Sequence, residues 1–248
     1  MVSNSLYLQL LAQRVSKKKC FALLLDPDKI TFAGLDIWID LANQAAVDYI
    51  FIGGSLMINN QLDLLIKTIR QNSAIPIILF PGSSRQLSYQ ADALLFLSLI
   101  SGRNADLLIG KHVETAPFIK MSNLEVLSTG YMLIDGGVAT SVSYMSNTNP
   151  IPADKNDIAV CTALAGEMLG LKLIYMDAGS GAKNPISAEM ITAVSQNIQI
   201  PLIIGGGIST ATAASQAAKA GADIVVVGNA IEKKPTLILE IAQILHNL

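Results

Sequence analysis

Two glycine-rich turns near the C-terminal end of the chain carry the clearest chemical signal in the sequence. The triplet 205–207 follows the apolar run 202–204, and Gly228 with Asn229 follows the apolar run 224–227. Glycine allows backbone amides to approach a ligand closely, and a helix that begins after such a turn attracts anions. An eight-stranded β/α barrel frequently binds phosphate in the loops after its last two strands. The pair of turns therefore favours a phosphate site, although glycines in these places can also serve only as turn residues.

A carboxylate stands beside a further glycine turn in the segment 175–182, which reads YMDAGSGA. The backbone amides of 179–182 could help to hold a phosphate, and Asp177 could accept a proton from a hydroxyl of the same ligand. A phosphorylated polyol suits this combination. The chain has only two histidines, His112 within a predicted helix and His246 near the end, so a serine or cysteine triad is not expected.

A divalent cation could bind where the first two predicted strands end. Asp26, held by Pro27, closes the first strand, and Ser55 closes the second. Mg²⁺ commonly takes one or two protein oxygens and fills its other positions with water and substrate phosphates. The motif 26–29, Asp-Pro-Asp-Lys, could equally be a helix cap, and the residues alone do not decide between the two.

The elements that must position these residues alternate between strands and helices. Continuous apolar runs predict buried parallel strands at 21–25, 49–52, 76–80, 93–100, 130–134, 171–176, 202–204 and 224–227. Helices are predicted at 6–15, around 35–41, at 60–70 with Asn60 as the cap, at 106–119, 154–169, 184–197 and 232–248, and in the alanine-rich stretch before the last strand. The polar stretch 141–157 is predicted to be a long surface loop. This alternation predicts one α/β domain, a (β/α)8 TIM barrel spanning 1–248.

In this fold the ligand site lies at the C-terminal ends of the strands. The candidates there are Asp26, Ser55, Ser83, Arg103, Asp135, Asp177, Ser180, Gly207 and Asn229. A regular third outer helix is missing from the pattern, because only 83–92, SSRQLSYQAD, separates the third and fourth strands and it has no apolar helical stripe. The barrel wall would then expose an apolar patch that a partner subunit or an apolar ligand would cover.

The composition agrees with one large apolar core and excludes several kinds of partner. The chain has 248 residues, of which 51% are hydrophobic and 15% charged, and its formal net charge is -2. The sequence has no basic face of the kind that binds nucleic acid. The longest apolar run, 93–100, is far too short to cross a bilayer, which needs about 20 residues. The first lysines follow a short apolar stretch, the reverse of a secretory signal. We therefore expect a cytoplasmic protein that acts on small molecules and forms a homo-oligomer, a dimer or higher.

Six motifs together resemble the geranylgeranylglyceryl phosphate synthases and their heptaprenyl-using relatives. They are LLDPDK at the first strand, GGS at the second, YMDAGSGA at the sixth, GGGI at the seventh, VVVGNA at the eighth, and SVSYMSNTNPIP, which looks like the branch found in archaea and some bacteria. Members of this family use Mg²⁺ and transfer a prenyl group from a polyprenyl diphosphate to the 3-hydroxyl of sn-glycerol 1-phosphate. The resemblance implies a Mg²⁺-dependent prenyltransferase that uses geranylgeranyl diphosphate and forms an ether-linked prenylglyceryl phosphate.

The resemblance also implies roles for individual residues. Asp26 and Ser55 would bind Mg²⁺, Asp177 would be the catalytic base, and Tyr131 would contact the prenyl chain or the acceptor. The glycerol phosphate would contact Tyr175, Met176, Asp177, Ala178, Gly179, Ser180, Gly181, Ala182, Gly206, Gly207, Gly228 and Asn229. One departure concerns the sixth strand, where many members have Tyr-Leu-Glu and this chain has Tyr-Met-Asp at 175–177. The shorter carboxylate reaches about one methylene less far toward a substrate.

Two other interpretations share the glycine turns. A different phosphate-binding TIM-barrel enzyme, an isomerase or a flavin-dependent oxidoreductase, would leave Asp26, Ser55 and the missing helix unexplained. Flavin absorbance in the purified protein would favour it. A non-catalytic phosphate-binding or assembly protein is compatible with aspartate at position 177, and the absence of turnover would favour that interpretation.

Overall fold

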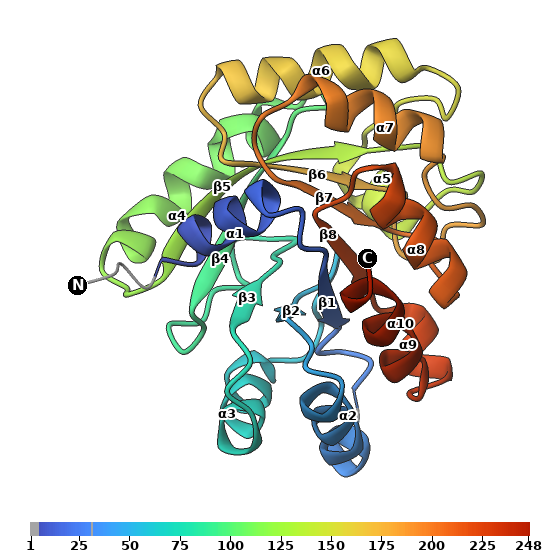
Figure 1. The fold of residues 1–248 in the computed structure, drawn as a ribbon. Coiled ribbons are helices and arrows are strands. Elements are labelled where there is room, and N and C mark those ends of the chain that lie inside the picture. The colour runs from blue at the N-terminus through green and yellow to red at the C-terminus, as the bar shows by residue number, and fades with distance from the viewer. Residues whose placement is uncertain (1–4, 31) are drawn as a thin grey trace.

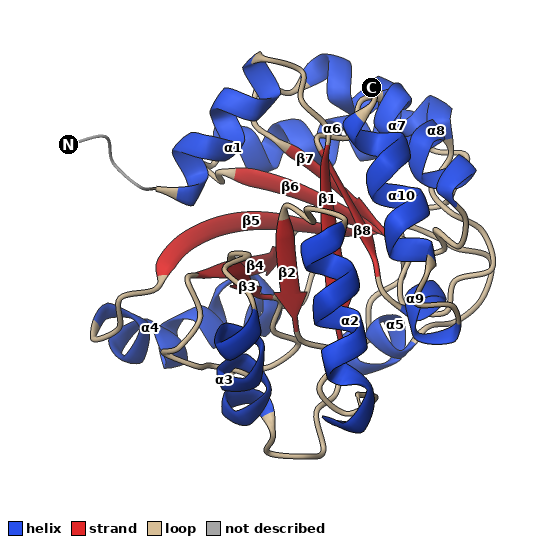
Figure 2. Cartoon of the chain, turned by 60° about the horizontal axis from the view of Figure 1, so that its bottom comes forward, coloured by secondary structure: helices blue, strands red, loops and turns tan. Residues whose placement is uncertain are grey.

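Eight parallel strands form a closed barrel with helices on its outside (Figures 1 and 2). The computed structural model describes residues 5–30 and 32–248, so residues 1–4 and 31 of the predicted span 1–248 lie outside the described residues. The strands are β1 (Cys20–Leu25), β2 (Tyr49–Ile52), β3 (Ile77–Leu79), β4 (Ala93–Leu99), β5 (Glu125–Leu133), β6 (Leu173–Asp177), β7 (Leu202–Gly205) and β8 (Ile224–Val227). Each strand pairs with the next and β8 pairs with β1, which confirms the predicted TIM barrel.

Both faces of the strands are buried, and this explains their continuous apolar runs. On β6, Leu173 and Tyr175 belong to the apolar cluster inside the barrel, whereas Ile174 and Met176 pack in the layer under the helices. Successive side chains of a strand point to opposite faces. Asp177 therefore continues the inward series at the last position of the strand.

Most of the helices form an outer ring, and the first one covers an end of the barrel. They are α1 (Leu6–Val15), α2 (Phe32–Gln44), α3 (Leu62–Asn72), α4 (Lys111–Lys120), α5 (Ser141–Ser146), α6 (Asn156–Met168), α7 (Ala188–Asn197), α8 (Ala211–Ala220), α9 (Asn229–Lys233) and α10 (Leu237–His246), and a π-helical turn, η1 (Asp106–Gly110), precedes α4. Leu6 and Leu10 of α1 pack on the interior cluster, and Glu125 at the start of β5 accepts hydrogen bonds from the backbone of Leu6 and Tyr7. Helix α1 thus closes the end at which the strands begin, opposite the predicted site.

Two helix predictions are wrong in detail. Asn60 is not the cap of α3, since the residue before that helix is Gln61 and its side chain makes no capping hydrogen bond. The helix predicted at 232–248 is divided into α9 and α10, because Pro235 lacks a backbone N–H and restricts the residue before it.

Two predictions between β4 and β6 also need correction. The predicted loop 141–157 contains α5 and the start of α6, and Thr140 forms a capping box with Ser143. Strand β5 begins at Glu125 rather than Gly130. Polar residues in its first half interrupt the apolar run, yet it pairs with β4 from Ala93 to Leu99.

The predicted absence of a regular outer helix between β3 and β4 is confirmed, since residues 80–92 contain no helix. Strand β3 pairs with β4 only through Ile78 with Ala93 and Leu79 with Leu94. Strand β4 continues to Leu99 against β5 alone. The barrel wall is therefore open beyond the end of β3. None of the helices in the described ranges is long and apolar enough to cross a membrane.

Candidate functional site

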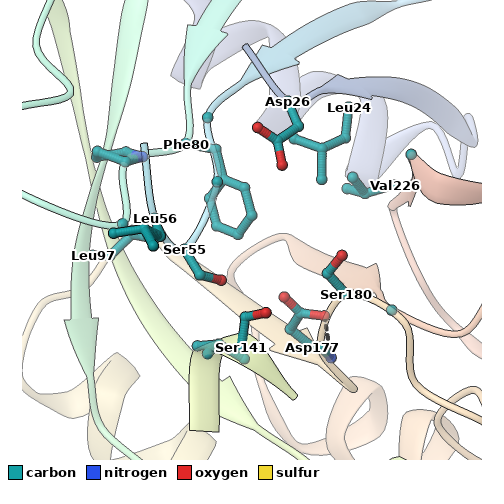
Figure 3. A pocket seen from close by; sticks show the side chains of 18 of the residues that line it. Leu24, Asp26, Ser55, Leu56, Phe80, Leu97, Ser141, Asp177, Ser180 and Val226 are labelled. Carbon is teal, nitrogen blue, oxygen red and sulfur yellow. Dashed lines mark hydrogen bonds between the residues drawn. The ribbon is translucent and has the colours of Figure 1, made fainter. Parts of the chain in front are cut away.

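A cavity of about 1030 Å³ opens at the C-terminal ends of the strands (Figure 3). Most of the predicted site residues line it: Asp26, Ser55, Tyr175, Asp177, Gly179, Ser180, Gly181, Ala182, Gly206, Gly207, Gly228 and Asn229. Figure 3 shows Asp26 and Asp177 on opposite sides, with Phe80 projecting between them. Residues from β1, β2, β6, β7 and β8 thus meet around one space.

Four sequence candidates lie away from this cavity or turn from it. Met176 and Ala178, which were predicted to contact the glycerol phosphate, do not line it, because both side chains pack in the layer between strands and helices. The guanidinium of Arg103 donates to the backbone oxygen of Gly102, and Asp135 accepts from the amide of Gly137. These hydrogen bonds hold Arg103 and Asp135 in their own loops.

Asp177 is the buried carboxylate of the site. Its Oδ2 accepts a hydrogen bond from the hydroxyl of Tyr131 at 2.6 Å, and its Oδ1 accepts one from the amide of Gly179 at 2.7 Å. Burial raises the pKa of Asp177 above its ordinary value, while the two hydrogen bonds oppose part of that rise. A carboxylate with a raised pKa is a stronger base, and this one lines the cavity.

Three aromatic rings surround the carboxylate on its inner side. Phe80 stacks on Tyr175 with ring centroids 4.9 Å apart, and Tyr131 lies edge-on to Tyr175 at 5.5 Å. Burial, followed by the nearby charge of Asp177, raises the pKa of both tyrosines well above the usual value. Both hydroxyls therefore stay neutral donors near pH 7 in a largely apolar wall.

The turn after β7 supplies backbone amides with no side chain in front of them. Gly206 has φ +80°, and a Cβ there would lie 2.5 Å from Oδ1 of Asp177 and 2.6 Å from the amide nitrogens of Ala178 and Gly179. Only glycine fits this backbone conformation and this close approach. The turns after β6 and β7 are therefore packed together, and both line the cavity. Glycine turns of this kind can hold an anion through backbone amides that have no other partner.

Polar contacts link the turns after β6, β8 and β1. Nδ2 of Asn229 donates to Ser180 Oγ at 2.9 Å, and its Oδ1 accepts from Lys29 Nζ at 3.1 Å. The same ammonium lies 3.5 Å from Asp26 and 3.7 Å from Glu232. Burial raises the pKa of Glu232, and Lys29 opposes that rise. In the sequence, Lys29 belongs to a possible cap and to the LLDPDK motif, and the fold adds that its ammonium lies between Asp26 and Asn229.

The surroundings of Asp26 fit a Mg²⁺ ion that takes few ligands from the protein. Its Oδ1 accepts from the amide of Asp28 at 3.1 Å, so part of the predicted cap-like bonding exists. A Cβ on Gly54 would lie 3.1 Å from Oδ2, so a larger residue there would crowd the carboxylate, and Lys29 Nζ lies 3.5 Å from the same oxygen. The described residues contain no cluster of three or more His, Cys, Asp or Glu that could hold a metal by itself. One carboxylate with Ser55, completed by water and phosphate oxygens, matches the usual donor set of Mg²⁺.

An apolar branch of the cavity leads through the opening in the barrel wall. Leu97 of the interior cluster lines it, and so do Leu94 and Phe96 of the outer layer. Beyond them the lining continues with Leu107, Thr115 and Ile119 on η1 and α4. The absence of a helix between β3 and β4 thus leaves an apolar channel, which continues from the polar part of the cavity at the ends of the strands.

Comparisons with known proteins give one consistent result. The model of the PcrB family matches residues 13–245. The geranylgeranylglyceryl phosphate synthase of Chitinophaga pinensis is 54% identical over 243 residues, which cover 98% of this chain and 96% of the relative. That of Spirosoma linguale is 51% identical and covers 94% of both chains.

A solved structure is similar over nearly the whole fold. It is that of (S)-3-O-geranylgeranylglyceryl phosphate synthase from Thermoplasma acidophilum in complex with its substrate sn-glycerol-1-phosphate. The TM-score is 0.92 at 29% identity, over 98% of this chain and 99% of the other. The similarity therefore extends over nearly the whole barrel.

Proposed function

Since the chain belongs to the PcrB family, we propose that it is a prenyltransferase that joins geranylgeranyl diphosphate to the 3-hydroxyl of sn-glycerol 1-phosphate. The observation that carries this proposal is the continuity of one cavity, which is lined by a buried carboxylate with glycine turns, by the candidate cation ligands Asp26 and Ser55, and by an apolar channel that leads outward. The names of the relatives support this function over a phosphate-binding isomerase, a flavin oxidoreductase or a non-catalytic protein.

Glycerol 1-phosphate would bind at the ends of β6, β7 and β8. The amides of Ser180, Gly181, Gly206 and Gly207 would hold its phosphate, because those of Gly179 and Ala182 already donate to Asp177 and to the oxygen of Gly179. The side chains of Ser180 and Asn229 would complete the rim. Tyr175 would line the inner side of this pocket. The glycerol part would then lie against Asp177, which is on the same wall.

Asp177 would remove the proton of the attacking hydroxyl. The hydroxyl oxygen forms a bond to C1 of the prenyl chain, the bond from C1 to the diphosphate breaks, and the proton passes to Asp177. Tyr131 and Gly179 each donate to one carboxylate oxygen, so they orient the base and leave its remaining lone pairs toward the cavity.

The donor substrate would occupy the other side of the cavity. Asp26 and Ser55 would hold Mg²⁺ at the diphosphate, where the ion neutralises the departing charge. The apolar channel would take the prenyl tail and exclude water from the reacting carbon. The dependence on Mg²⁺ and the polyprenyl diphosphate substrate are parts of this proposal, as are a homo-oligomeric state and a cytoplasmic location.

The direct test is turnover of labelled sn-glycerol 1-phosphate with geranylgeranyl diphosphate and Mg²⁺. We expect an ether-linked product with the wild-type protein and a loss that depends on Mg²⁺ concentration in Asp26→Asn. A series of diphosphates of increasing length would define the preferred chain. Full activity of Asp26→Asn at low Mg²⁺ would contradict the cation site, and an absence of product with any prenyl diphosphate would contradict the function.

A further inference from the structure

The segment that replaces the third outer helix contains a buried glutamine. Gln86 is only 2% exposed, although it lies between β3 and β4 in a stretch without regular structure. Its Oε1 accepts from the amides of Gly54 at 3.3 Å and Gly82 at 3.1 Å, and its Nε2 donates to the oxygen of Gly54 at 2.8 Å. Two donors face one end of the side-chain amide and one acceptor faces the other, so its orientation is defined.

The backbone groups that Gln86 contacts have no other partner in the described part of the chain. The amide and carbonyl of Gly54 and the amide of Gly82 bond only to this side chain. The strand ladders end just before them, with the amide of Gly53 on Leu25 and that of Phe80 on Ile52. Beyond these ladders, and within the residues that the structure describes, Gln86 makes the hydrogen bonds that connect the turns following β2 and β3.

The turn that Gln86 holds is the one that faces Asp26. The α-carbon of Gly54 directs its missing side chain at the Asp26 carboxylate, with 3.1 Å from a Cβ to Oδ2. Gly82 packs so closely on Ser55 that a Cβ there would lie 2.8 Å from its α-carbon. A displacement of either turn would therefore change the distance between Asp26 and Ser55.

We propose that Gln86 is a positioning residue that assembles the cation and diphosphate side of the site by tying the turn 53–55 to the turn after β3. This inference rests on the proposed function, because it gives Gln86 a task at the site proposed for Mg²⁺ and diphosphate. It predicts that the loss of Gln86 impairs this side alone. The glycerol phosphate side depends on β6, β7 and β8, whereas the side-chain hydrogen bonds of Gln86 go to Gly54 and Gly82.

The test measures binding directly with Mn²⁺ and inorganic pyrophosphate, read by electron paramagnetic resonance, and with sn-glycerol 1-phosphate, read by calorimetry. In Gln86→Leu, three backbone groups lose their partner, and we expect Mn²⁺–pyrophosphate affinity to fall by about tenfold or more. The affinity for glycerol 1-phosphate should change by less than about twofold. In turnover, the KM for the prenyl diphosphate should rise more than kcat falls.

Ser88→Ala is the matched control, because Ser88 is equally buried in the same segment and its hydroxyl contacts Asp63 rather than the site turns. It should leave both affinities at wild-type values. An unchanged Mn²⁺–pyrophosphate affinity in folded Gln86→Leu, or an equal loss for both ligands, would overturn the positioning role. A wild-type protein that binds no Mn²⁺–pyrophosphate would instead overturn the proposed cation site.

Gln86→Glu keeps the test decisive if the leucine variant does not fold. The ionised glutamate retains the acceptor but places an oxygen against the carbonyl of Gly54. We expect weak Mn²⁺–pyrophosphate binding at about pH 8, and recovery relative to wild type as the pH falls and protonation restores a donor. A ratio of variant to wild-type affinity that does not change with pH would contradict the role of the Nε2 contact.

Discussion

The turns after β6, β7 and β8 and the region between β2 and β4 line the same cavity but are built in different ways. On the first side the strands are covered by helices, and glycine turns pack so tightly that a Cβ at Gly206 would lie within 2.6 Å of two backbone nitrogens. On the second side β3 has three residues, the next helix is absent, and a glutamine side chain replaces the continuing strand ladder. The β6–β8 side therefore has complete secondary structure and lines the cavity with glycine turns. The region between β2 and β4 lacks a helix and lines the cavity with apolar side chains.

The largest effect is expected from Asp177→Asn, which tests whether the chemistry belongs to the β6–β8 side. An amide cannot take up the proton, so kcat should fall by about 10² to 10⁴. Mn²⁺–pyrophosphate affinity should stay unchanged, because Asp177 lies on the opposite wall from Asp26. Steady-state kinetics combined with direct binding would check this, and a variant with nearly wild-type kcat would remove Asp177 as the base.

The opposite side would be tested by Thr115→Trp, which fills the apolar channel at α4. Thr115 lines the cavity, so a large side chain there should raise the KM for geranylgeranyl diphosphate by about 10-fold to 200-fold and favour shorter donors. Val113→Trp is the control on the same helix, since Val113 is 67% exposed and does not line the cavity. Equal chain-length profiles for the two variants would show that the prenyl tail lies elsewhere.

A smaller effect is expected from Gly206→Ala, which probes the tight packing of the glycine turns. The added Cβ meets both backbone strain and a clash, and we expect a loss of about 1–3 kcal/mol in unfolding free energy together with weaker glycerol 1-phosphate binding. Gly170→Ala has a similar φ of +85° but open space around the Cβ, so it carries the strain without the clash. Chemical denaturation and calorimetry would check the pair, and equal losses in both variants would refute the packing argument.

The smallest effect is expected from Tyr131→Phe, which should shift the pH dependence of kcat. The hydroxyl of Tyr131 stabilises the ionised form of Asp177, so its removal should raise the pKa of Asp177 further. Because the ionised base is the active form, the acid limb of kcat should move to higher pH than in wild type. If the acid limb stays in place or moves to lower pH, the hydrogen bond from Tyr131 does not stabilise the ionised form of Asp177 during the reaction.

Much of the fold and most of the site could be predicted because their signals are local. Buried parallel strands need continuous apolar runs, and turns that approach a ligand need glycine, so β1, β8, Gly206 and Gly228 are visible in short windows. The absence of an outer helix was visible for the same reason, as 83–92 has no apolar stripe. The start of β5 was missed because its polar residues break the pattern while pairing with β4 sustains the strand.

By itself, then, the sequence determined the barrel, the missing helix and the turns that carry the glycines and carboxylates. Only the tertiary structure decided that Tyr131 donates to Asp177 across 46 positions, and that Gln86 holds Gly54 across 32. It also decided that Met176 faces the helices while its neighbours Tyr175 and Asp177 line the cavity. Such contacts depend on strand register and barrel closure, which bring together residues that are far apart in the sequence. The residues next to them in the chain do not indicate which partner they will meet.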